Sequence, residues 1–153
     1  MAIAQLSKVK LEYFTHGDGP RRVVFIHGFQ GSVRIGTELL GLASTLISAP
    51  LQVLARLHTL AAKGAVQDAE LGRPRDGTAA DRLQGVGALL TARTLAPALV
   101  VAAITHAELM SAAPFASRNG LVARAVERLV LVARGVDAKS LLVPEAAHPR
   151  LRA

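Results

Sequence analysis

Val23-Val24-Phe25-Ile26-His27-Gly28-Phe29-Gln30-Gly31-Ser32 is the stretch of this 153-residue chain from which the predicted fold follows. Its first four residues are β-branched or aromatic, which predicts a strand buried on both faces. The glycines that follow allow backbone N–H groups to approach a ligand without a Cβ in the way. Upstream, residues 11–14 predict an earlier strand, and Gly17-Asp18-Gly19-Pro20 predicts the turn that reverses it.

The composition fits a single folded domain over residues 1–153. Hydrophobic residues make up 51% of the chain and charged residues 19%, a balance that does not indicate disorder. The net charge of +7 suggests a nucleic-acid partner, but the basic residues are scattered singly or in pairs such as Arg21-Arg22. We therefore expect no nucleic-acid binding. The chain has no cysteine, which excludes disulfides and thiol nucleophiles.

Targeting and membrane signals are weak. No signal peptide is evident at the start of the chain, so the expected location is cytoplasmic. The best transmembrane candidate, residues 39–55, contains Ser44, Thr45 and Gln52 and falls short of about 20 apolar residues. We therefore expect no stable membrane span.

The rest of the chain alternates between two kinds of hydrophobic pattern. Helices are predicted at residues 38–48, after the loop 72–77, where Asp76 or Thr78 would cap the helix, and at 107–113. Strands are predicted at residues 98–103, 128–133 and 141–143, while 51–55 fits either a strand or a helix that continues to 63–64. This alternation predicts an α/β fold, a mostly parallel sheet flanked by helices.

The order of these segments resembles the α/β-hydrolase family. His27-Gly28-Phe29 looks like its oxyanion loop, and residues 95–101 look like the strand that leads to its nucleophile. Where that family has Gly-x-Ser-x-Gly, this chain has Ala103-Ile104-Thr105-His106-Ala107. Residues 138–149 look like the family's last strand and histidine loop. The chain is short for the family, so its cap and acid-bearing unit are expected to be absent, leaving a truncated α/β-hydrolase-like domain.

The resemblance implies a role for each candidate residue. It makes Thr105 the nucleophile, His148 the general base and Asp137 the group that orients the base. Alternatively, Thr105 is an ordinary residue at a strand end, His148 a solvated tail residue and Asp137 a turn residue. The residues expected around the oxyanion or binding site are His27, Gly28, Phe29 and His106. The implied activity, if the degenerate active site functions, is hydrolysis of a small ester or related acyl compound; the alternative is a catalytically impaired site.

No cofactor is expected, and no metal site, because the sequence lacks a His-x-x-x-His pair or a carboxylate cluster. Two other functions remain open. The first is a non-catalytic scaffold or remnant of the fold, which would associate with a partner or with itself through an exposed sheet edge. The second is an Ala/Leu-rich helical protein that lies at a membrane through residues 39–62.

Overall fold

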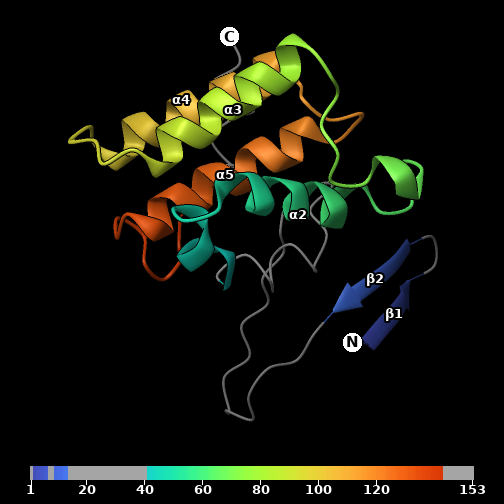
Figure 1. The fold of residues 1–153 in the computed structure, drawn as a ribbon. Helices are drawn as coiled ribbons and strands as arrows, with labels where there is room; N and C mark the ends of the chain where they lie inside the picture. Colours follow the sequence, from blue (N-terminus) through green and yellow to red (C-terminus); the bar gives the residue numbers. More distant parts are fainter. Residues whose placement is uncertain (1, 7–8, 14–40, 143–153) are drawn as a thin grey trace, which may run out of the picture.

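Four helices form the main body of the protein. The computed structural model describes residues 2–6, 9–13 and 41–142. The helices are α2 (Pro50–Ala62), α3 (Thr78–Thr91), α4 (Ala98–Ala112) and α5 (Asn119–Ala133). Both α2 and α4 pack against α3 and α5, and successive helices run in opposite directions (Figure 1). This arrangement is an up-down four-helix bundle.

The helices form because their buried residues recur every three or four positions. In α2 the buried side chains include Val53, Leu54 and Leu57, and Pro50 stands in the first turn, where its missing N–H costs nothing. In α5 they include Val122, Val126, Leu129 and Val130. A helix with this spacing presents one apolar stripe to the core.

The core lies between the four helices, and side chains from all of them meet there. Leu46, from the helical residues 41–46 that precede α2, is also buried in it. Gly87 of α3 lies directly against Leu51 of α2, since a Cβ at position 87 would stand 3.1 Å from Leu51 Cδ2. The missing side chain thus allows α2 and α3 to pack closely.

An antiparallel hairpin precedes these helices in the sequence. Strand β1 (Ala2–Leu6) pairs with β2 (Val9–Tyr13), with Ala2 opposite Tyr13 and Leu6 opposite Val9. The strand predicted at residues 11–14 is thus present over its described residues, 11–13. The turn at residues 17–20 and the stretch 23–32 lie outside the described residues.

The predicted α/β fold is wrong. Residues 41–142 contain helices and loops but no parallel sheet, so the expectation of a truncated α/β-hydrolase-like sheet is overturned. The predicted strand 98–103 and helix 107–113 are one continuous helix, α4. The predicted strand 128–133 is the second half of α5. Short apolar runs fit a buried helix as well as a buried strand, and the alanines of α4 favour the helix.

Other local predictions are confirmed. Helix α3 occupies the region expected after the loop 72–77, with Leu83, Val86 and Leu90 buried. Residues 51–55 belong to α2, as the helical alternative required.

The prediction that Asp76 or Thr78 caps α3 is wrong. Gly77 occupies the N-cap position of α3, with a φ of 76°, and no side chain forms a cap hydrogen bond there.

Candidate functional site

Thr105, the predicted nucleophile, lies in the middle of α4 rather than on a strand-to-helix turn. Its side chain has 0% exposure and belongs to the buried side of the helix. Its hydroxyl has no hydrogen-bond partner among the described residues. The oxygen is therefore shielded from solvent in the packed bundle.

The other described candidates lie in different surroundings. His106 Nδ1 stands 2.9 Å from Glu127 Oε2, which links α4 to α5. Both carboxylate oxygens of Asp137 accept backbone hydrogen bonds, from the N–H of Leu141 at 2.8 Å and of Leu142 at 2.9 Å. Asp137 thus closes the turn that follows α5. His148 and the predicted oxyanion residues His27, Gly28 and Phe29 lie outside the described residues.

The outward side of α4 is the most unusual surface of the bundle. Here Leu99, Val100, Ile104 and Met110 are 62%, 45%, 46% and 42% exposed. Two alanines complete the surface, which we call the α4 face: Leu99, Val100, Ala103, Ile104, Ala107 and Met110. The helix also buries Val101, Ala102 and Leu109, so it is apolar on two opposite sides, with His106 and Glu108 between them. A helix with two apolar sides normally has both of them covered.

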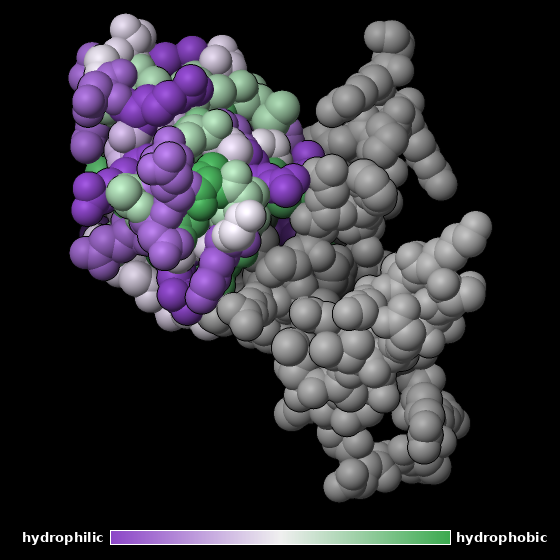
Figure 2. All heavy atoms as spheres, turned by 90° about the vertical axis from the view of Figure 1, so that its right-hand side faces the viewer, coloured by the Kyte–Doolittle hydropathy of each residue, from purple (hydrophilic) through white to green (hydrophobic). Residues whose placement is uncertain are grey.

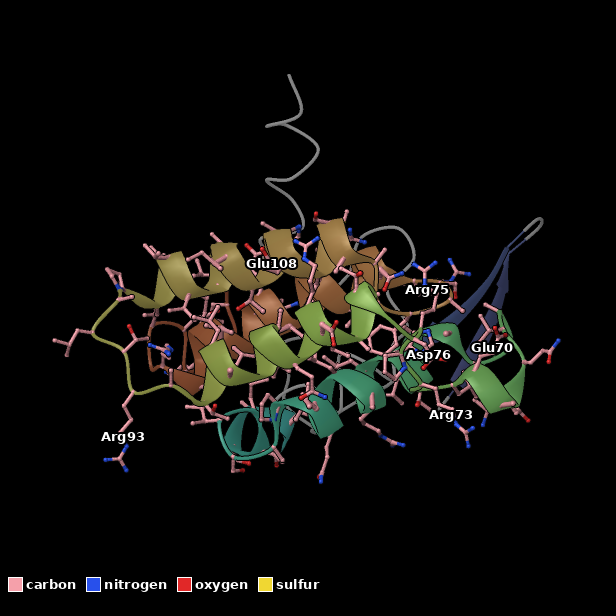
Figure 3. All side chains as sticks on the ribbon, turned by 45° about the horizontal axis from the view of Figure 1, so that its top comes forward. Glu70, Arg73, Arg75, Asp76, Arg93 and Glu108 are labelled. Carbon is pink, nitrogen blue, oxygen red and sulfur yellow. The ribbon has the colours of Figure 1, made fainter. Side chains whose placement is uncertain are left out.

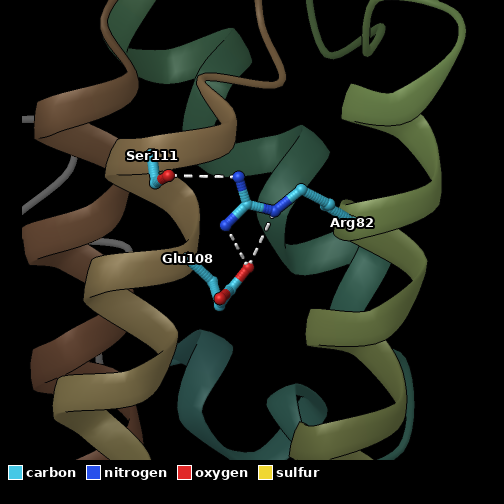
Figure 4. Close-up of polar contacts among 3 residues, drawn as sticks. All are labelled: Arg82, Glu108 and Ser111. Carbon is cyan, nitrogen blue, oxygen red and sulfur yellow. Dashed lines mark hydrogen bonds and ion pairs between the residues drawn. The ribbon is translucent and has the colours of Figure 1, made fainter.

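Polar pairs border the α4 face on both flanks. On the α3 side, Arg82 donates to Glu108 Oε2 from Nε at 3.0 Å and from Nη2 at 2.7 Å, and its Nη1 donates to Ser111 Oγ (Figure 4). On the α5 side stands the pair of His106 and Glu127. Glu108 and His106, the polar residues of α4 beside the face, are therefore already matched by charged groups of the bundle itself.

Other charged side chains gather at the ends of the bundle. Glu70, Arg73, Arg75 and Asp76 extend from one end, and Arg93 extends from the opposite end, just before α4 begins (Figure 3). Hydrophilic side chains cover most of the described surface in Figure 2, which faces the end that carries η1 (Asp68–Glu70). The apolar character of the α4 face is thus not general to the surface.

A second unusual feature is a histidine in the core. His58 of α2 has 0% exposure, and its ring stacks on Phe115 with centroids 4.3 Å apart. Its Nδ1 accepts a hydrogen bond from the Gly72 backbone N–H at 2.9 Å, which leaves the proton of the neutral ring on Nε2. Sequence analysis missed this residue, although its spacing from Leu54 places it on the apolar stripe of α2.

The surroundings of His58 keep it uncharged. Burial lowers the pKa of His58, while the Ser117 backbone and the Glu70 carboxylate act in the opposite direction more weakly. Nε2 lies beside Ser117 without a hydrogen bond of normal geometry. The neutral ring thus connects α2 to the loops that contain Gly72 and Phe115, and these contacts stabilise the fold.

Metal and membrane features are absent from the described ranges. Residues 2–6, 9–13 and 41–142 contain no group of three His, Asp or Glu side chains placed to hold a metal ion. None of the helices found in those ranges combines the length and apolar character needed to cross a bilayer.

Comparisons with protein-family models, curated proteins and solved structures give no match to this chain.

Proposed function

We propose that this protein is a non-catalytic association module and that the α4 face is its binding surface for an apolar helix of a protein partner. The observation that carries the proposal is the outward apolar side of α4, exposed although the opposite side of the same helix fills the core. Exposed apolar surfaces of this kind mark interaction sites.

Binding at the α4 face has a clear driving force. Fully burying a large aliphatic side chain contributes about 1.5–3 kcal/mol, so a half-exposed one gains about 1 kcal/mol. Leu99, Val100, Ile104 and Met110 are each exposed enough to gain that amount. Their sum is offset in part by the entropy that two molecules lose on association.

The chemistry of the partner follows from the chemistry of the face. The α4 face contains no charged side chain, and Arg82 and Glu108 at its edge are already paired. A charged partner surface would lose its hydration there without gaining an ion pair. The surface that fits is a helix with its own charge-free apolar stripe.

The test measures whether the α4 face is covered in cells that make the protein. The chain contains no cysteine, so a single introduced thiol reports on one position. Ile104→Cys places it on the α4 face, and Ile47→Cys is the matched control, since the two side chains are 46% and 45% exposed. A membrane-permeant maleimide labels both variants in the cell and in dilute purified protein.

We expect Cys at position 104 to react about tenfold more slowly in the cell than Cys at position 47, which corresponds to nine-tenths occupancy of the face. In dilute purified protein the two rates should converge. Equal rates in the cell would overturn the proposal. Recovery of the protected protein in the membrane fraction would also overturn it, in favour of a lipid surface.

A further inference from the structure

We infer that the helix that covers the α4 face is α4 of a second copy of this chain, packed antiparallel about a two-fold axis. The inference rests on the proposed function and adds the identity and direction of the partner helix. It follows from the sizes of the side chains along the face, the charges around it and the area that it offers.

The middle stripe of the face, which lies between Leu99 on one side and Ile104 on the other, has small side chains at its centre and larger ones at both ends. Ala103 and Ala107 lie at its centre, with Val100 before them and Met110 after them. In an antiparallel pair centred between the alanines, Ala103 of one copy meets Ala107 of the other, and Val100 meets Met110. Small residues at the crossing point let the two backbones approach, while the larger ones pack at both ends. The same stripe thus fits itself, as a two-fold contact requires.

The charges favour a second copy in the antiparallel direction. A second α4 presents a face as free of charge as the first, which is the complement that the partner must supply. A parallel pair would bring the two Arg93 side chains to one level, at the positive ends of both helix dipoles. The antiparallel pair separates them by the length of the helix and sets the dipoles head to tail.

The size of the contact sets its strength. The α4 face offers six residues on each copy, fewer than the roughly 20–30 residues a side of a standard stable interface, so the contact is a small one. We therefore expect a reversible dimer with a dissociation constant on the order of micromolar.

The experiment uses two single-cysteine variants of the full chain, Val100→Cys and Met110→Cys, one of them with a longer tag. These positions lie about 15 Å apart along the helix, too far for a disulfide between equivalent residues of an antiparallel pair. Each variant is oxidised alone and in a mixture of the two. The antiparallel dimer predicts a cross-linked species in the mixture, of hybrid size, and little product from either variant alone.

Ile104→Glu added to both variants should abolish the product, whereas Ile47→Glu at the matched position should leave it unchanged. Circular dichroism of each variant checks that the helices remain. Sedimentation of the cysteine-free chain over a range of concentrations should show a monomer–dimer equilibrium that Ile104→Glu shifts to monomer.

Two results would overturn the inference and leave the proposed function standing. Cross-linking of each variant with itself indicates a parallel pair. A chain that stays monomeric at every concentration, while Cys at position 104 is protected in cells, indicates a different protein partner. Equal labelling of positions 47 and 104 in cells rejects the proposed function itself.

Discussion

The imidazole of His58 lies parallel to the ring of Phe115, with the two planes within 6° of each other. The stack connects α2 to the loop between α4 and α5. Through Nδ1 the same ring also holds Gly72, in the connection between α2 and α3. One neutral side chain therefore ties together three segments of the chain: α2, the connection from α2 to α3, and the loop between α4 and α5.

Acid should destabilise the protein through His58. Its folded-state pKa lies below the unfolded value of about 6.5, so the unfolded chain binds more protons once the pH falls below that value. The stability that the neutral ring contributes is therefore complete above pH 6.5 and declines as the pH falls toward the folded-state pKa. Urea unfolding from pH 7.5 to 5 should show the midpoint falling, and His58→Gln should remove that part of the slope. An unchanged slope in the variant would contradict this assignment.

Gly72 should tolerate no side chain. Its φ is +72°, and a Cβ there would lie 2.9 Å from Thr59 Oγ1 and 3.0 Å from the Ala55 carbonyl oxygen. Gly64 is the matched control, with a φ of +81° but nothing within 4 Å of its Cβ position. Gly64→Ala should cost about 1 kcal/mol of unfolding free energy for the left-handed backbone alone. Gly72→Ala should cost clearly more, and equal losses in chemical denaturation would argue against the crowding.

Thr105→Val should not destabilise the protein. The Thr105 hydroxyl is buried without a hydrogen-bond partner among the described residues, so its removal should raise the unfolding free energy by about 1 kcal/mol. Thr59 provides the comparison, because its hydroxyl donates to the Ala55 carbonyl at 2.9 Å. Thr59→Val should lower stability or leave it unchanged. Thermal unfolding of both variants measures the difference, and a destabilised Thr105→Val protein would show that the hydroxyl has a stabilising contact.

The Asp137 carboxylate should stabilise the turn that follows α5. Asp137→Ala removes both acceptors for the Leu141 and Leu142 N–H groups, and a loss of about 1 kcal/mol is expected, as for a helix cap. Amide hydrogen exchange should become faster at residues 141 and 142. Asp137→Asn retains one acceptor oxygen and should give a smaller change. Exchange rates that do not respond would show that the turn does not depend on the carboxylate.

Local patterns in the sequence predicted part of the fold correctly. The spacing of Leu83, Val86 and Leu90 indicated α3, and the turn residues at 72–77 indicated the loop before it. The runs at 98–103 and 128–133 were misread as strands. So short an apolar run carries no period that separates a buried strand from a buried helix, and the resemblance to a hydrolase favoured the strand.

The surroundings of the candidate site residues could be predicted even less well than the helices, because they depend on how the helices pack. Thr105 was singled out for its position in the chain, and only the assembled bundle shows it to be buried. His58 was missed, because the residues that hold it, Gly72 and Phe115, belong to other segments.

The sequence by itself determined that a helix follows the loop 72–77 and that no thiol chemistry is available, because these depend on neighbouring residues and on composition. Only the tertiary structure decided which side of α4 faces outward. Because α4 is apolar on two opposite sides, its own sequence does not favour either side for the core. The packing of α3 and α5 covers one side, and the α4 face is what remains exposed.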